Sequence, residues 1–164
     1  MAETILLQVQ GEVPERLLKD IYGKINPVYI IDLLSKNGMP TDEDTISAVT
    51  NSYVNGFPTT DPALKVLPYD GGRIFFGIAS GDTCRPERMS VKYLILDMIQ
   101  TRLAEAGIKS ELNIADLNSD TVEYMDKRGI FKGKLPELER IASERGSFEG
   151  VALGAVAAYN TPVE

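Results

Sequence analysis

The residues best suited to chemistry lie together between positions 80 and 90. Such a loop, placed between a strand and a helix, presents free backbone N–H groups and the positive helix end to an anion. Arginines and hydroxyl side chains add donors that suit phosphate or carboxylate. We therefore expect a site for a small anionic ligand, a phosphorylated or carboxylated molecule, formed by Ser80, Gly81, Thr83, Arg85, Arg88 and Ser90.

The same segment also has a purely structural explanation. Pro86 can start a helix and Asp82 or Thr83 can cap it, while both arginines stay solvated or pair with nearby acids. The strict phosphate-loop patterns, Gly-Lys-Ser/Thr and G-x-G-x-x-G, are absent from the sequence. The segment therefore indicates an anion site without identifying a nucleotide or a cofactor.

Residues 77–90 resemble the phosphate loop of flavodoxin-like flavin reductases. The similar positions are Gly77, Ser80, Arg85 and Ser90. In that family the loop follows the first strand of the sheet, whereas about half of this chain precedes residue 80. We assign no flavin from this resemblance, and the cofactor stays unknown.

Cys84 is the best candidate for a nucleophile in the chain. It precedes a predicted helix and is followed by Arg85, an environment that can lower the pKa of a thiol. With no histidine to serve as its base, an inert thiol is the simpler interpretation. We therefore expect Cys84 to be dispensable.

A second group of candidates follows the next predicted strand, at Asp116 and Asn118. Open α/β sheets bind ligands at the carboxyl ends of their strands, so both residues could approach the 80–90 loop. Asp116 could orient a ligand hydroxyl, hold a hydrated magnesium ion, or act as an acid or base. A turn and a helix cap explain the same two residues equally well.

The sequence contains no histidine and one cysteine. These counts exclude serine–histidine and cysteine–histidine nucleophile pairs, histidine-ligated metals and cysteine-rich zinc sites. We predict no metal site of those kinds. Any catalysis must use carboxylates, Cys84, tyrosine, lysine, arginine, hydroxyls or a cofactor.

Hydrophobic periodicity and turn residues predict the elements that would position these groups. Residues 148–159 are apolar and rich in small side chains, which favours a buried strand and leaves a closely packed helix as the alternative. The expected elements are a strand at 4–10, helices from 14, 27 and 41, strands at 73–79 and 109–116 around a helix ending at 107, and helices over 120–128 and 136–146.

The strand, helix and strand between 73 and 116 have the lengths of a βαβ unit, which would make the two strands parallel. The expected fold class is α/β, with a largely parallel or mixed sheet, flanking helices on both faces and a helical N-terminal third. Residues 57–68, rich in proline, are the best internal boundary. They are too short to divide residues 1–164 into two domains.

Composition places the chain among globular proteins, with 43% hydrophobic and 25% charged residues. Its net charge of −7 disfavours nucleic acid and anionic membrane surfaces as partners. The lone cysteine, and a start without a basic and apolar leader, favour a reducing cytoplasmic location. No apolar run is long enough to cross a membrane.

These observations support two functions. The first is a small-molecule-binding protein, which could be an enzyme, with its ligand at the 80–90 loop. The second is a noncatalytic subunit or assembly factor that acts through protein contacts; the missing histidine and the incomplete motifs favour it. The small residues of 148–159 could pack a homo-oligomer, although core packing explains them as well. The alternating charges of 120–128 and 137–145 are most simply solvated helix faces.

Overall fold

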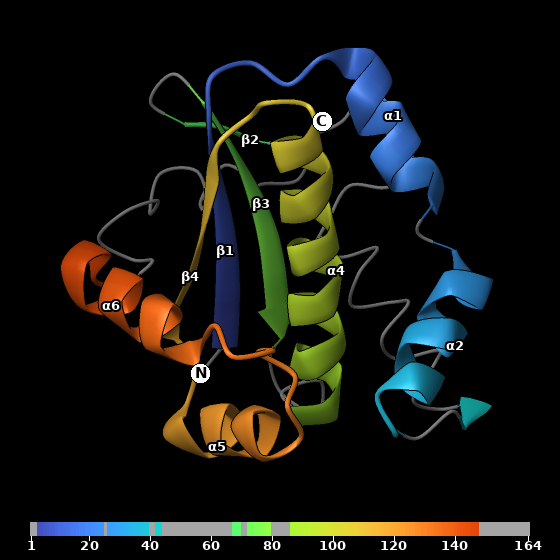
Figure 1. The fold of residues 1–164 in the computed structure, drawn as a ribbon, viewed down its shortest axis with the longest axis vertical. Helices are drawn as coiled ribbons and strands as arrows, with labels where there is room; N and C mark the ends of the chain where they lie inside the picture. The colour runs from blue at the N-terminus through green and yellow to red at the C-terminus, as the bar shows by residue number, and fades with distance from the viewer. Residues whose placement is uncertain are drawn as a thin grey trace, which may run out of the picture.

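The computed structural model describes residues 3–24, 26–39, 42–43, 67–69, 72–79 and 86–147 (Figure 1). The predicted helix after Thr41, apart from residues 42 and 43, lies outside this part of the chain, and so does the tail 148–159. The elements in order are β1 (Glu3–Gln10), α1 (Glu15–Lys24), α2 (Pro27–Lys36), β2 (Leu67–Tyr69), β3 (Gly72–Ala79), α4 (Pro86–Glu105), β4 (Ser110–Asp116), α5 (Ser119–Lys127) and α6 (Leu135–Arg145).

The described sheet has four strands in the order β2-β3-β1-β4, and every neighbouring pair is antiparallel. The prediction of a largely parallel or mixed sheet with a βαβ unit is therefore wrong. Two described helices contact the sheet: α4 lies across one face of it, and α6 lies beside β4 (Figure 1). The predicted helices on both faces are not seen among the described residues.

The physical reason is that β1 takes the place between β3 and β4. Glu3 lies opposite Ala79 on one side, and Thr4 lies opposite Asp116 on the other. Because both strands are antiparallel to β1, they run in the same direction and end at the same edge, but they do not pair with each other. From Glu3 to Leu7 every residue of β1 is buried, which fits a strand that is paired on both of its sides.

The first two helices follow the predicted pattern. Asn26 caps α2 by accepting a hydrogen bond from the Tyr29 N–H to its Oδ1 at 3.0 Å, and Pro27 occupies the first turn, where a missing N–H costs nothing. The helix stops at Asn37, and Gly38 follows with a φ of 64° that favours glycine. Leu18 and Ile21 of α1 are buried in the core.

Helix α4 forms the centre of the core. Every residue from Met89 to Asp97 is buried. One side of the helix faces the sheet, while α2 and α5 pack against its other sides (Figure 1). The strand residues in the same cluster are Ile5, Leu7, Val9, Leu112 and Ile114. This burial includes the charged side chains Lys92 and Asp97, so the middle of α4 has no solvent-exposed polar face.

The loop 128–134 closes over α4. Phe131 is buried and meets the Tyr93 ring edge to face, with ring centroids 5.1 Å apart. Lys134 Nζ lies 2.7 Å from Asp97 Oδ1, and Lys132 Nζ lies 3.9 Å from Oδ2. Lys132 has a φ of 53°, which is uncommon for a residue other than glycine. An aromatic contact and a partly buried ion pair therefore hold the loop in place.

The Tyr93 hydroxyl is buried, and no group in the described part of the chain bonds to it. Burial, with a smaller effect from the Asp97 carboxylate, raises the pKa of this hydroxyl above its usual range. The hydroxyl therefore stays protonated at all ordinary pH values, and it adds a desolvation cost to the core.

Tyr93→Phe removes the unbonded hydroxyl and keeps the ring contact. The free energy of unfolding should stay the same or rise by about 1 kcal/mol, whereas Phe131→Ala should lower it by about 3–5 kcal/mol. Urea denaturation of both variants measures these changes. A loss above about 1 kcal/mol in Tyr93→Phe would show that the hydroxyl has a bonding partner.

Candidate functional site

The candidate site lies at the edge of the sheet where β3 and β4 both end. Ala79 is the last residue of β3, and α4 begins seven residues later at Pro86. Asp116 ends β4, and α5 begins at Ser119. Both helices therefore start from the same sheet edge, the lower one in Figure 1. The predicted anion loop is the connection between β3 and α4.

Much of the predicted ligand set falls outside the described residues. Residues 80–85, which include Ser80, Gly81, Thr83, Cys84 and Arg85, are among them. Arg88 lies in the first turn of α4, and its side chain is likewise outside the description. The roles assigned to these residues remain predictions.

Ser90 is described, and its hydroxyl already has a partner. The residue is fully buried in α4, and its Oγ donates a hydrogen bond to the Pro86 carbonyl at 2.7 Å. This bond, from a serine to the carbonyl four residues earlier, is a common way for a helical serine to satisfy its donor. The donor that the sequence assigned to a ligand is engaged within the helix.

A β-bulge precedes Asp116. Thr4 lies opposite Asp116 and Leu6 lies opposite Asn113, so β4 carries one residue more than β1 between these pairs. The Asn113 side chain supports the irregularity, because its Oδ1 accepts a hydrogen bond from the Ala115 N–H at 2.8 Å. Its Nδ2 donates to a carbonyl just after α6 at 3.1 Å.

The extra residue changes the face on which Asp116 lies. Paired residues share a face of the sheet, so Asp116 lies with Thr4. Neighbouring Ile5 contacts the α4 core, which puts Thr4 and Asp116 on the other face. Asp116 Oδ1 accepts a hydrogen bond from Ser147 Oγ at 2.9 Å. Asp116 thus lies at the edge where β3 also ends, on the face of the sheet away from α4.

Glu3 belongs to this edge and was missed in the sequence. It is 2% exposed, and its Oε1 accepts a hydrogen bond from the Asn118 N–H at 2.9 Å. Asn118 is the N-cap of α5, and its own side chain makes no capping bond. The Glu3 carboxylate therefore satisfies the backbone N–H of the N-cap residue at the start of α5. An acid joined to the apolar run of β1 was the only signal of this role.

The chain matches no protein-family model, no curated protein and no solved structure. Its site must therefore be argued from its own residues. Across the described ranges, no group of three or more acid, cysteine or histidine side chains is arranged to hold a metal ion. No helix within them is both long and apolar enough to cross a membrane.

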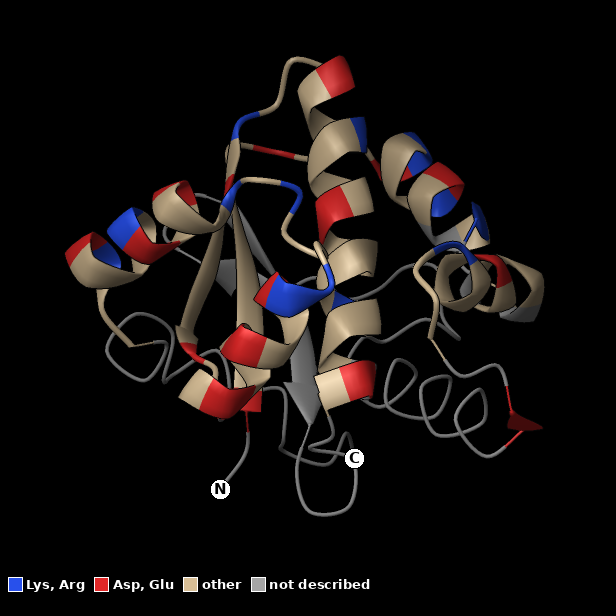
Figure 2. Ribbon diagram, turned by 60° about the horizontal axis from the view of Figure 1, so that its bottom comes forward, with Lys and Arg blue, Asp and Glu red and all other residues tan. Residues whose placement is uncertain are grey.

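Charges gather where the two helices begin. Glu87 lies in the first turn of α4 and Asp120 in the first turn of α5 (Figure 2). Burial, and next the Glu87 carboxylate, raises the pKa of Tyr124, so the start of α4 lies beside α5. The Arg128 guanidinium carbon stands 3.5 Å from the centre of the Tyr124 ring. Acids in a first turn complement the positive helix end.

A groove of about 480 Å³ lies between α5, α6 and the end of β4, and we call it the α5–α6 groove. Its apolar residues are Ile114, Ala115, Val122, Leu135 and Ala142, and its polar ones are Ser119, Glu123, Asp126 and Glu139. The alternating charges of these helices predicted solvated faces, because periodicity does not show that two helices meet. The groove is therefore a second candidate site.

Glu3→Ala tests the coupling between β1 and α5. It leaves the Asn118 N–H without its acceptor, so the free energy of unfolding should fall by about 1–3 kcal/mol. Glu3→Gln, which keeps a side-chain oxygen as acceptor, should retain most of this free energy of unfolding. Chemical denaturation measures both variants, with exposed Glu12→Ala as the control, expected within about 0.5 kcal/mol of the parent. Equal effects of Glu3→Ala and Glu12→Ala would contradict the assigned role.

Proposed function

We propose that the chain binds a small phosphorylated or carboxylated molecule at the edge where β3 and β4 end, through residues 80–90. The observation that supports this function best is that α4 and α5 both begin at this edge. Free N–H groups and the positive ends of two helices then point toward one region.

The Glu3 carboxylate distinguishes the two helix starts, because it binds only the start of α5 in the described part of the chain. It already occupies the N-cap N–H of α5, so that helix end is compensated from within the protein. The start of α4 follows Arg85 directly and includes Arg88 in its first turn. We therefore assign the ligand anion to the start of α4.

The remaining residues have supporting roles in this proposal. Ser80 and Thr83 supply hydroxyl donors, and Gly81 lets the backbone approach the anion closely. Asn118, just after β4, would contact the less charged part of the ligand, whereas Asp116 lies on the other face of the sheet and would reach the ligand only around its edge. If binding leads to a reaction, Asp116 is the candidate acid or base and Cys84 the candidate nucleophile.

A second function, a noncatalytic subunit acting through protein contacts, is favoured by two surface features. One is the α5–α6 groove. The other is a pair of exposed apolar side chains on α2, Val28 at 76% and Ile31 at 41% exposure. They lie one helical turn apart, so they form a small apolar patch.

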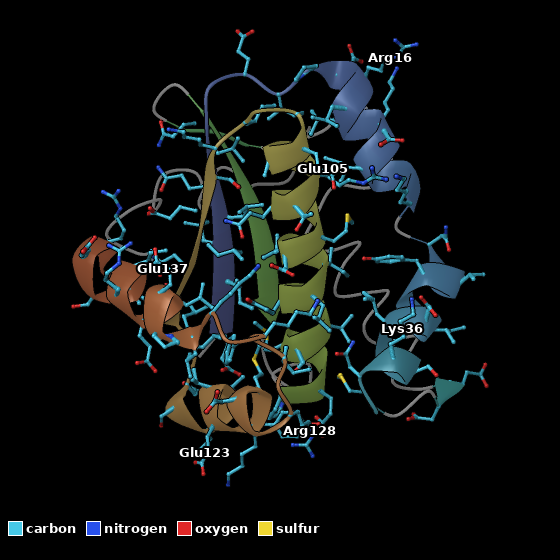
Figure 3. The ribbon with its side chains drawn as sticks, viewed as in Figure 1. Arg16, Lys36, Glu105, Glu123, Arg128 and Glu137 are labelled. Atoms are coloured by element: carbon cyan, nitrogen blue, oxygen red, sulfur yellow. The ribbon has the colours of Figure 1, made fainter. Side chains whose placement is uncertain are left out.

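Arg85→Ala and Arg88→Ala test the anion site. Each lost charge-assisted bond should weaken binding by about 1.5–3 kcal/mol, at least tenfold in affinity, with little change in stability. Calorimetric titration with inorganic phosphate and with malonate measures the affinities. Arg16→Ala is the matched control, because Arg16 lies on α1 at the opposite end of the sheet (Figure 3). Affinities unchanged in both Arg85→Ala and Arg88→Ala would refute the site.

Cys84→Ser should keep its phosphate affinity within about twofold, because a hydroxyl replaces the thiol at a position that needs no thiolate. The thiol itself should react with iodoacetamide no faster than glutathione does at neutral pH. A much faster reaction would reveal a lowered thiol pKa and would make Cys84 a nucleophile.

A further inference from the structure

The α5–α6 groove is built from one stripe of residues on each helix. Ser119, Val122 and Asp126 recur along α5, and Leu135, Glu139 and Ala142 recur along α6, at the spacing that keeps residues on one helix face. Each stripe spans seven residue steps, about 10 Å at 1.5 Å per residue. The groove is therefore long enough for a few residues of a peptide chain.

The lining separates into an apolar floor and acidic sides. Ile114, Val122 and Leu135 are buried or half-buried and pack against the protein core. Glu123 and Asp126 of α5 and Glu139 of α6 are exposed. A bound molecule would thus meet apolar surface beneath it and carboxylates beside it.

The cations nearby do not neutralise these carboxylates fully. In the described part of the chain, neither Asp126 nor Glu139 forms an ion pair, and only Glu123 has one, with Lys127 at 2.8 Å. Outside the groove, by contrast, Glu137 and Glu144 both bind Arg140. The groove thus keeps a local negative charge that the rest of α6 does not have.

We infer that the α5–α6 groove binds a basic segment of a partner protein. An aliphatic side chain of that segment packs on the floor, and its lysine or arginine heads meet Asp126 and Glu139. The stems of those cations cover further apolar surface. This inference does not depend on the anion site that we propose at the start of α4.

The shape of the groove favours a protein segment over a small amine. The groove is largely open to solvent, whereas small-molecule pockets enclose most of their ligand. A segment held by the rest of its protein needs no such enclosure, and it supplies both the apolar anchor and the charge. Its attraction to the acidic groove should weaken as salt rises.

The test uses the full chain and a fluorescein-labelled peptide of alternating arginine and leucine, followed by fluorescence anisotropy. The double variant Asp126→Asn/Glu139→Gln should bind the peptide at least tenfold more weakly than the parent. The double variant Glu137→Gln/Glu144→Gln removes the same charge from the same region outside the groove, and it should change the affinity less than twofold. Arg85→Ala should leave peptide binding unchanged, which separates this test from that of the anion site.

A second peptide, with serine in place of leucine, tests the floor and should bind at least fivefold more weakly. Val122→Ser should weaken binding of the leucine peptide in the same direction, and its unfolding curve shows whether the fold is kept. Equal losses in the two double variants would mean general attraction to an acidic protein and would overturn the inference. The inference would also be overturned if the serine peptide bound as tightly as the leucine peptide, or if spermidine bound the groove as tightly as the leucine peptide and displaced it. Absence of any binding of the leucine peptide would overturn it too.

Discussion

Helix α4 is buried on every side from Met89 to Asp97, and this burial shapes the surrounding structure. The sheet covers one side, and α2, α5 and the loop 128–134 cover the others. The buried part of the helix includes a carboxylate, since Asp97 is only 7% exposed. A carboxylate so placed needs a cation, and Lys134 supplies one at 2.7 Å. The positive φ of Lys132 is tolerated within a loop that this pair and Phe131 hold in place.

The position of α4 also sets the candidate site. The helix lies along the sheet with its first turn at the edge where β3 ends. The same edge receives β4 and the start of α5, because β1 separates two strands that run in the same direction. Glu3, at the start of β1, then joins the centre of the sheet to the cap of α5. The central strand β1 therefore both orders the sheet and contacts the candidate site through Glu3.

Local patterns in the sequence predicted most of the described elements. The alternation of strand and helix, the restart at Pro27 and the stop at Asn37 and Gly38 are encoded by neighbouring residues, and the structure confirms them. The order of the strands in the sheet, by contrast, is not encoded by neighbouring residues. The partners of β1 lie more than 60 residues away in sequence, and the strand–helix–strand pattern from β3 to β4 is the same whether or not a strand lies between them.

The candidate site was harder to predict for the same reason. A single extra residue in β4 moves Asp116 to the other face of the sheet, and only the pairing with β1 reveals it. Glu3 and Asn118 meet across 115 residues of sequence. The α5–α6 groove requires two amphipathic helices to meet beside the same strand. Each of these features depends on long-range contacts, whereas the arginine-containing loop can be proposed as a site from the sequence because its residues are consecutive.

The most direct test of the anion site is a ¹H–¹⁵N NMR titration of the full chain with inorganic phosphate, followed at every assigned amide. Binding at the start of α4 should shift the amides of residues 79–90 in a saturable manner, with smaller shifts near Asn118. The amides of α1 and α6 should stay in place. Saturable shifts confined to other elements, or no saturable shift at any concentration, would contradict an anion site at this edge of the sheet.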